Sequence, residues 1–406
     1  MDKREFYRDA RGDRAGPLDG VRVLELSKVW SGPMAGCLLA DLGADVVRVE
    51  MPGNREGRMP PEIPGTGRSW FRESVHRNKR SVSLDLRKPE SAAVFLDLVA
   101  GVDVVLENYK PGTLDRWGIG YAACAARRPG IVFVSISGWG QFGPMADAPG
   151  YDPIAQAVSG WMALNGSADG PPVKAPTFLA DDLAGLHAAI GTLAALRHRD
   201  VTGEGQHVDV SLLDSLLYNS GGYLTLGATD TPIRRWGAEA EFVVPAGTYA
   251  CADGHLYLAI ALDKHWRVLA DLIGRPDLAR ADGFATNEAR RANRTAVNDV
   301  VAAWCATRPV ADAVAALAGE GLAAAPVRRF ADAAADPHVI ERDMVQETVL
   351  CNGTTAPLTG PSIKFSRTPT RVRTGAPEPG ADTDDVLRAA GLDTDRIEEL
   401  RALRAI

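Results

Sequence analysis

Strand-like and helix-like hydrophobic patterns alternate through the first half of the chain. Short apolar or alternating stretches lie at residues 21–26, 45–50, 81–86, 102–106, 131–136 and 207–210. Stretches with helical spacing separate them, one opened by Ser31-Gly-Pro and closed by Gly43, another opened by Pro89. Strands that alternate with helices predict an α/β fold with a mostly parallel, doubly wound sheet.

The pattern changes near Ala240. Residues 247–260 are typical of two short strands joined by a tight turn at Asp253-Gly254, and alanine-rich helical stretches follow to residue 320. This part predicts a second, α+β domain. Short strands and a terminal pair of amphipathic helices are expected within residues 355–406.

Two adjacent carboxylates, Asp181 and Asp182, precede a long apolar helical pattern. The residues that recur at spacings of three to four, as on one helical face, are Leu183, Leu186, Ile190, Leu193 and Leu196. A carboxylate at a helix start accepts hydrogen bonds from free backbone N–H groups and is favoured by the helix dipole. Two interpretations stay open here: a helix N-cap beside a solvated neighbour, which is the commoner case, or a catalytic carboxylate.

Composition narrows the class of protein. The 406 residues are 46% hydrophobic and 24% charged, as in ordinary globular proteins, and a net charge of -7 argues against a general nucleic-acid binder. Five scattered cysteines and seven scattered histidines show no metal-binding or redox spacing. The first 20 residues lack the apolar segment of a signal peptide, and no apolar run approaches the length of a membrane span. We therefore expect a cytoplasmic protein without a metal.

Three common enzyme motifs are missing. The first strand–helix–strand unit suggests a dinucleotide site with Glu50 on the ribose, but its turn lacks Gly-x-Gly-x-x-Gly and carries Trp30 and Pro33 instead. The glycine-rich segment 138–144 lacks the ending of a phosphate loop, and no Gly-x-Ser-x-Gly elbow of a hydrolase occurs.

Polar and basic side chains occur near the expected carboxyl ends of several strands. They are Asn78-Lys79-Arg80, Arg87-Lys88, Asn108-Tyr109-Lys110 and Arg116. Each alone is most simply a solvated loop charge. Together they suit an extended phosphorylated anion, and Tyr109 suits stacking on a base.

Short segments in order along nearly the whole chain carry a family resemblance. They are Pro17–Leu26, Ser31-Gly-Pro, Gly43–Glu50, Asn78–Ser81, Glu107–Gly112, Gly150-Tyr-Asp, Leu179-Ala-Asp, Thr202–Gln206 and Ala325-Pro-Val. In these segments the chain resembles the family III CoA-transferases, the CaiB/BaiF group that contains formyl-CoA transferase and carnitine CoA-transferase.

The resemblance implies a large Rossmann-like domain built from both termini, residues 1–225 and 336–406, and a smaller α+β domain at 226–335. It implies an interlocked homodimer and selects Asp181 as the catalytic aspartate, with Asp182 as a neighbour that caps the helix or is solvated. The coenzyme contacts that it carries over are Trp30, Ser31, Arg87, Asn108, Tyr109, Lys110, Arg116, Tyr151 and Asp152.

The implied activity is transfer of coenzyme A from an acyl-CoA donor to a small carboxylic acid, through mixed anhydrides and an aspartyl-CoA thioester. No permanently bound cofactor, metal, nucleic acid or membrane is expected; coenzyme A enters as part of the substrate. Backbone N–H groups at the helix start are expected to keep Asp181 ionised and to stabilise oxyanions.

Two departures affect the substrate rather than the reaction class. Trp30 stands where formyl-CoA transferase has glutamine, and its run of glycines is absent near residues 238–247. A 2-methylacyl-CoA racemase remains an alternative, but Tyr151 occupies the place of its histidine, and an unperturbed phenol titrates near ~10. A non-catalytic acyl-CoA-binding protein is a second alternative. Lys28, Trp30, Trp139 and residues 234–236 are candidates for the acyl pocket.

Overall fold

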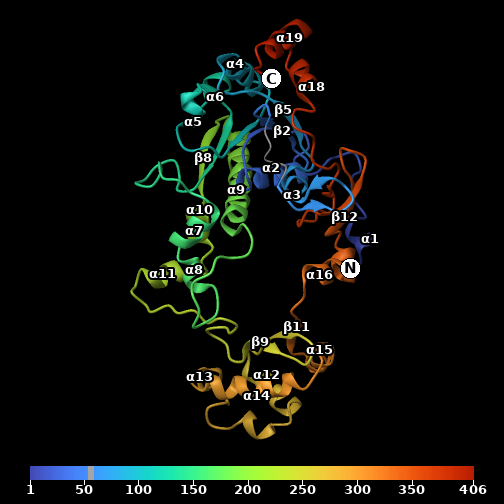
Figure 1. Ribbon diagram of the computed structural model, residues 1–406. Helices are drawn as coiled ribbons and strands as arrows, with labels where there is room; N and C mark the ends of the chain where they lie inside the picture. The colour runs from blue at the N-terminus through green and yellow to red at the C-terminus, as the bar shows by residue number, and fades with distance from the viewer. Residues whose placement is uncertain (54–58) are drawn as a thin grey trace. The chain divides into compact units, whose positions relative to one another are not determined.

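The computed structural model describes residues 1–53 and 59–406 (Figure 1). The chain forms two compact units. Unit 1 contains Met1–Trp161, Lys174–Thr229 and Asp336–Ile406, and unit 2 contains Met162–Val173 and Asp230–Ala335. Along the chain, α8 (Trp161–Leu164) lies at a boundary between them.

Unit 1 is built on a six-stranded sheet in the order β5-β2-β1-β6-β7-β8. Its strands are β1 (Arg22–Leu26), β2 (Asp45–Glu50), β5 (Arg80–Ser83), β6 (Val104–Glu107), β7 (Val132–Ser137) and β8 (Gln206–Ser211). All five pairings are parallel, which confirms the predicted α/β fold class.

The predicted strand at 81–86 is shorter than expected, because β5 ends at Ser83. Beyond it, the Asp85 backbone N–H donates to the carbonyl of Ala405, and Leu84 and Leu86 are buried in the core. The Leu84 backbone N–H still donates to the Glu50 carbonyl of β2, and from Asp85 onward the run reflects burial under the C-terminal segment.

Helices cover both faces of the sheet, because successive strand residues point to opposite sides. One face packs Leu24 and Val105 against α4 (Pro89–Val99), α18 (Thr383–Ala389) and α19 (Thr394–Ala402). The other face packs Val23 and Val104 against α2 (Ser31–Asp41) and α9 (Leu179–Thr202). Both ends of the chain therefore contribute to unit 1.

The leucine-rich face of α9 is only partly buried. Leu186, Ile190 and Leu193 are exposed, at 42%, 62% and 37%. The buried side of α9 carries small residues instead, among them Ala180, Ala184, Ala188 and Ala195. Small side chains let the helix lie close to α2 and the sheet, and of the larger residues in the predicted apolar face Leu196 alone is fully buried with them.

Unit 1 contains further short helices and strands. They are α1 (Lys3–Phe6), β3 (Glu62–Ile63), β4 (Arg68–Ser69), α3 (Trp70–His76), α5 (Thr113–Arg116), α6 (Tyr121–Arg127), α7 (Asp152–Val158), α10 (Leu212–Tyr218), α11 (Tyr223–Gly227), α17 (Pro337–Glu341), β12 (Val345–Val349) and β13 (Thr355–Thr359). Strand β13 confirms the short strand expected after residue 355, and it pairs antiparallel with β12, which lies before the predicted range.

Unit 2 has its own antiparallel sheet, in the order β11-β10-β9, and its own core around Trp266 and Trp304. Its elements are β9 (Ala246–Ala250), β10 (His255–Ala259), α12 (Asp263–Leu272), η2 (Pro276–Ala279), α13 (Asn287–Ala292), α14 (Arg294–Ala306), α15 (Val310–Gly319), β11 (Ala323–Pro326) and α16 (Phe330–Ala334). The predicted hairpin is confirmed, since β9 and β10 pair on either side of Asp253-Gly254.

Among the described residues, α9 is the one single helix long and apolar enough to cross a membrane, and the bent pair α14–α15 passes the same test of length and composition when taken together. Half of the apolar stretch of α9 is buried inside the structure. A core helix of a folded domain shows the same composition.

Candidate active site

Asp181 and Asp182 lie inside the first turn of α9. The helix begins at Leu179, and its N-cap residue is Phe178, whose side chain makes no capping hydrogen bond. The N-cap interpretation of the two aspartates is therefore wrong: the helix starts two residues before Asp181. The Asp181 side chain is buried, with an exposed fraction of 8%, and Asp182 is half-buried.

Burial controls the ionisation of Asp181. It raises the pKa of this carboxyl to about 7, the negative charges of Asp152 and Asp182 act in the same direction, and a hydrogen bond from Ser31 opposes the rise. The expectation that helix N–H groups hold Asp181 fully ionised is thus wrong in direction. Loss of hydration beside two further carboxylates outweighs the helix dipole.

Ser31 is held by the turns that follow two neighbouring strands. Its Oγ accepts a hydrogen bond from Asn108 Nδ2 at 3.3 Å. Asn108 in turn accepts from the Lys28 backbone N–H at 2.7 Å and donates to the Lys28 carbonyl at 2.8 Å. The carboxyl ends of β1 and β6 are thereby fastened together beside Asp181, as the topology of a doubly wound sheet favours.

Gly32 is required for this close approach. A Cβ at this position would lie 2.4 Å from the Ser27 Cβ and 3.2 Å from Asn108 Cγ. The Ser31-Gly-Pro segment therefore has a structural reason for its glycine, which is to bring α2 against the turn after β6.

Asp182 has a specific partner that the sequence did not reveal. Its Oδ1 accepts a hydrogen bond from Trp30 Nε1 at 2.6 Å. The expectation that Asp182 caps the helix or is solvated is therefore wrong. The indole packs against Trp70, Phe71 and Phe178, with ring centroids 4.6 to 5.9 Å away, so the Asp182 carboxylate meets a fixed aromatic cluster.

Asp152 stands at the start of α7 and reaches the same helix turn. Its Oδ1 accepts from the Ala180 backbone N–H at 2.7 Å, and its Oδ2 accepts from Gln156 Nε2 at 2.8 Å. Asp152 thus satisfies one free N–H of the first turn of α9, and its charge also raises the pKa of Asp181. The structure brings Trp30, Ser31, Asn108 and Asp152 together around Asp181.

Apart from Tyr109, the remaining predicted coenzyme residues are exposed, three of them on loops and turns and Arg116 at the end of α5. Arg87 pairs with Asp85 at 2.8 Å, Lys110 lies 3.9 Å from Asp147, and Arg116 donates to Thr113 at 3.0 Å. The hydrogen bonds and ion pairs of the described residues do not link these three, or the 65% exposed Tyr151, to Asp181.

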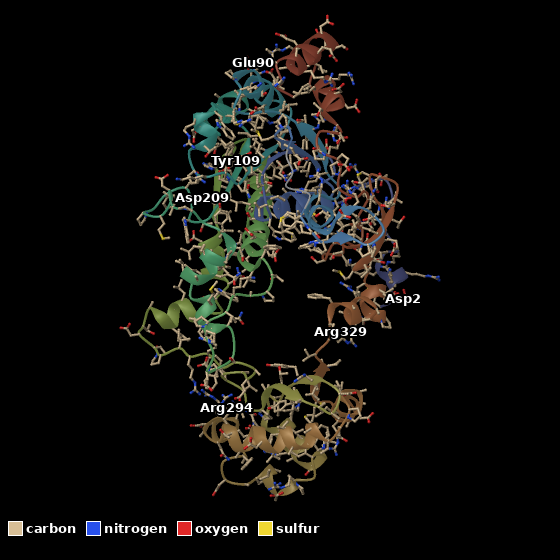
Figure 2. The ribbon with its side chains drawn as sticks, in the orientation of Figure 1. Asp2, Glu90, Tyr109, Asp209, Arg294 and Arg329 are labelled. Carbon is tan, nitrogen blue, oxygen red and sulfur yellow. The ribbon has the colours of Figure 1, made fainter. Side chains whose placement is uncertain are left out.

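Tyr109 follows Asn108 on the turn after β6 (Figure 2). The Lys28 Nζ lies 4.6 Å from the centroid of its ring, and the ring contacts Trp117 at 5.1 Å. Because Lys28 also borders Asn108, this aromatic side chain stands next to the Ser31–Asn108 contact.

The cluster Asn78-Lys79-Arg80 does not follow a strand; it leads into β5. Lys79 is buried, its Nζ lies 2.6 Å from Glu25 Oε2, and it donates to the Pro33 carbonyl at 2.8 Å. Lys79 therefore steadies the first turn of α2 and is not available to a phosphate.

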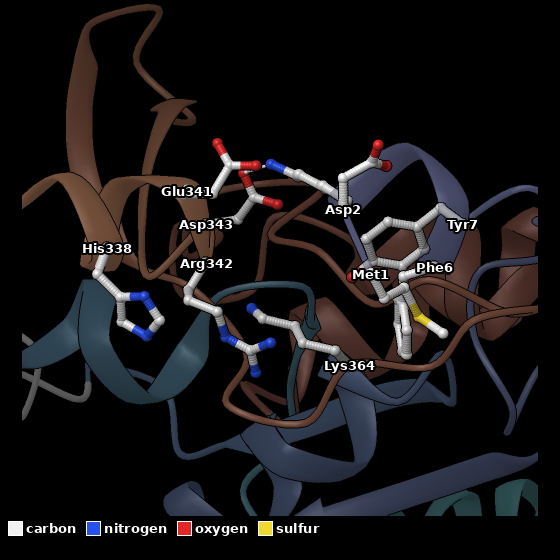
Figure 3. Close-up of a pocket in the computed structure, with 10 residues that line it drawn as sticks. Met1, Asp2, Phe6, Tyr7, His338, Glu341, Arg342, Asp343 and Lys364 are labelled. Carbon is white, nitrogen blue, oxygen red and sulfur yellow. Dashed lines mark hydrogen bonds and ion pairs between the residues drawn. The ribbon is translucent and has the colours of Figure 1, made fainter.

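A cavity of about 360 Å³ in unit 1 lies away from these residues (Figure 3). It is lined by Met1, Asp2, Lys3, Phe6, Tyr7, His338, Glu341, Arg342, Asp343 and Lys364. Lys3 bridges it with a 2.9 Å ion pair to Asp343, and none of the lining residues belongs to the predicted site.

A doubly wound parallel sheet that presents a buried aspartate on a helix turn defines an α/β enzyme with a candidate carboxylate nucleophile. The model of CoA-transferase family III matches residues 18–383, and the chain belongs to that family. It is a transferase of coenzyme A, as its segments predicted.

Characterised relatives match over almost the full chain. The chain is 36% identical over 399 residues to the succinyl-CoA–L-malate CoA-transferase β subunit of Chloroflexus aurantiacus, covering 96% of this chain and 98% of that one. It is 35% identical over 386 residues to a succinate–glutarate CoA-transferase of Agrobacterium fabrum, covering 92% and 96%.

Solved structures agree with the fold. A CaiB/BaiF family protein from Brucella suis superposes with a TM-score of 0.84 at 33% identity, covering 93% of this chain and 100% of that one. The predicted family and fold class are confirmed together.

Proposed function

We propose that the protein moves coenzyme A from succinyl-CoA to a short dicarboxylic acid. The two relatives described above are named for succinate or its thioester and for a C4 or C5 dicarboxylic acid, and they share about a third of their residues with this chain. The observation that carries the proposal is the buried Asp181, in contact with Ser31 at the end of the sheet.

Asp181 acts as a nucleophile in the proposed mechanism. Its carboxylate attacks the donor thioester carbonyl, which forms an acyl–aspartyl anhydride and expels the coenzyme A thiolate. The thiolate then attacks the aspartyl carbonyl, releases the donor acid and leaves an aspartyl-CoA thioester.

The second half repeats these steps with the acceptor. The acceptor carboxylate attacks the aspartyl-CoA carbonyl, forms a new anhydride and expels the thiolate. The thiolate attacks the acyl carbonyl of the acceptor, which yields the new acyl-CoA and restores the Asp181 carboxylate. Burial of Asp181 supports this role, because a poorly hydrated carboxylate is more reactive than one in water.

Exposed basic turns would bind the rest of the coenzyme. In this proposal Arg87, Lys110 and Arg116 hold phosphates, supported by their exposure on unit 1, and the half-buried Tyr109 stacks on the base. Contacts remote from the reacting carbon supply binding energy that positions the thioester.

The two alternatives have less support. A racemase needs a second acid or base on the opposite side of the α-carbon, and the 65% exposed Tyr151 is not held against the buried Asp181. Uptake of α-deuterium from heavy water by a 2-methylacyl-CoA would support it. A non-catalytic binder needs no aspartate of raised pKa, and an aspartyl-CoA adduct trapped with hydroxylamine would exclude it.

A screen of acyl-CoA donors against carboxylic acids by mass spectrometry tests the activity and the substrates. Asp181→Ala is expected to abolish exchange and to leave coenzyme binding nearly intact, with Asp182→Ala as the matched neighbour. Full activity in Asp181→Ala together with loss in Asp182→Ala would overturn the assignment of the nucleophile. We also place the enzyme in the cytoplasm as a homodimer.

A further inference from the structure

Three side chains on neighbouring strands form a hydrogen-bond chain behind the turn that carries Asn108 and Tyr109. Glu107 ends β6, Ser135 lies on β7, and His207 lies on β8. Glu107 and Ser135 are direct partners in the β6–β7 register. Both are buried, with exposed fractions of 5% and 1%, whereas His207 is exposed at the edge of the sheet.

The contacts run without a break from the edge strand to the turn. His207 Nε2 lies 2.9 Å from Ser135 Oγ, and Ser135 donates a hydrogen bond to Glu107. Glu107 Oε2 accepts from the Tyr109 backbone N–H at 2.7 Å. A hydroxyl donates one proton and accepts others, so the chain has two complete arrangements.

In the first arrangement, Glu107 is a carboxylate that accepts from Ser135 and Tyr109, while His207, as the imidazolium, donates its Nε2 proton to Ser135. In the second, Glu107 carries a proton and donates it to Ser135, whose own proton points to His207. Reversal of these hydrogen bonds therefore moves one proton from the His207 imidazolium to Glu107 and leaves His207 neutral, and solvent at the exposed His207 ring supplies or takes up that proton.

We propose that Glu107, Ser135 and His207 form a proton-carrying chain that positions the coenzyme-binding turn, and that this turn is held firmly only while Glu107 is ionised. Glu107 is a positioning residue here, since it acts through the Tyr109 backbone. The inference rests on the proposed role of this turn in coenzyme binding.

The charge state of Glu107 changes in the physiological range. Burial raises the pKa of Glu107 to about 7 against the hydrogen bonds from Ser135 and Tyr109, and the charges of Asp115 and Asp209 add to the rise. Burial lowers the pKa of His207, against the same two aspartates. Stacking on Tyr121, 5.1 Å away, fixes the imidazole ring. An ionised acceptor makes a stronger hydrogen bond than a neutral one. Protonation of Glu107 at low pH therefore weakens its hydrogen bond from the Tyr109 backbone N–H.

The test is the dissociation constant of coenzyme A between pH 6 and pH 8, measured by calorimetry. All proteins carry Asp181→Asn, because Asp181 titrates in the same range. The parent is expected to bind about fivefold more weakly at pH 6 than at pH 8, the difference between a charged and a neutral hydrogen bond. Adding Glu107→Gln keeps the shape and the acceptor oxygen, and is expected to remove the pH dependence.

His207→Phe is the second variant, and the proposal can be tested with it alone if Glu107→Gln does not fold. It keeps a ring against Tyr121 and removes both the donor of the first arrangement and the acceptor of the second, so the midpoint of the pH dependence is expected to change. An unchanged midpoint in His207→Phe, or the parental pH dependence in Glu107→Gln, overturns the proposal.

A third variant shows whether the turn at Tyr109 binds coenzyme A at all, independently of the proton chain. Tyr109→Ala is expected to weaken coenzyme binding at pH 8. Unchanged binding in Tyr109→Ala shows that the turn does not bind coenzyme, whereas weakened binding with no pH dependence in the parent overturns the proton chain alone.

Discussion

Catalysis requires the Asp181 carboxyl group to be ionised, but its burial favours the neutral, protonated form. Its pKa is raised to about 7 in the folded protein, above the ordinary value of an unfolded aspartate. The folded state therefore holds a proton that the unfolded chain releases between about pH 4 and 7. The stability that this proton contributes is complete at low pH and is lost as the pH rises through 7.

Asp181→Asn is accordingly expected to be more stable than the parent at pH 8, by up to about 4 kcal/mol, and equally stable at pH 4. The amide has the shape of the carboxyl group but never ionises. Urea unfolding at the two pH values measures the difference. An equal difference at both values would show that Asp181 is not desolvated in the folded protein.

Lys79 and Arg80 are adjacent residues whose ion pairs are expected to contribute very differently to the stability of the folded protein. Lys79→Met leaves the carboxylate of Glu25 buried with one cation fewer and is expected to destabilise the protein by about 3–5 kcal/mol. Arg80 pairs with Asp45 on the surface, with both side chains more than 40% exposed, so Arg80→Met is expected to cost less than about 1 kcal/mol. Unfolding by urea at pH 7 compares the two, and similar losses would contradict the ranking.

At the scale of elements, the contact between α2 and α9 places Ser31 beside Asp181. Gly185 on α9 is part of this contact, since a Cβ there would lie 3.0 Å from the Ser31 carbonyl oxygen and 3.0 Å from Met34 Cγ. The glycine and alanine residues of α9 thus set the distance between the two helices. Leu186, Ile190 and Leu193 of the predicted apolar face lie on the other side, whereas Leu196 is buried in the core.

Gly185→Ala is expected to push α2 away from α9, lowering both stability, by about 1–3 kcal/mol, and the rate of CoA transfer. Gly319→Ala is the control, because this helical glycine has nothing within 4 Å of the added Cβ. The control is expected to be neutral or slightly stabilising. Normal transfer in Gly185→Ala would show that Ser31 tolerates displacement.

At the scale of the whole molecule, the outer face of α9 exposes Leu186, Ile190 and Leu193 in one stripe. A stripe of large apolar side chains on a helix marks a contact surface when other exposed apolar residues adjoin it. Ile154 and Val158 of α7 are also exposed, and α7 and α9 share one core. This surface suits the proposed second copy of the chain.

Ile190→Glu is expected to convert a dimer into smaller species, because it places a charge in the apolar stripe. Arg197→Glu changes an exposed charge on the same helix and is the matched control. Light scattering after size-exclusion chromatography gives the masses. A dimer that survives Ile190→Glu would place the interface elsewhere.

Much of the fold was predictable, because strands and helices express local periodicity. Strand β2 and the hairpin in unit 2 follow their patterns closely. Strand β5 is shorter than its pattern, since the chain leaves β2 after Leu84 and Asp85 bonds to the C-terminal segment, which buries Leu84 and Leu86. The spacing of apolar residues predicts which side chains are buried, but it does not predict which part of the chain covers them.

The sequence by itself determined the alternating α/β order, the family and Asp181 as the candidate nucleophile. Only the tertiary structure decided what surrounds that carboxylate: Trp30 bonded to Asp182, and Asp152 bonded to the turn of α9. It also reversed the expected direction of the Asp181 pKa shift. The physical reason is that burial and charge at Asp181 come from residues distant in the sequence, and only the packing of helices on the sheet brings them together.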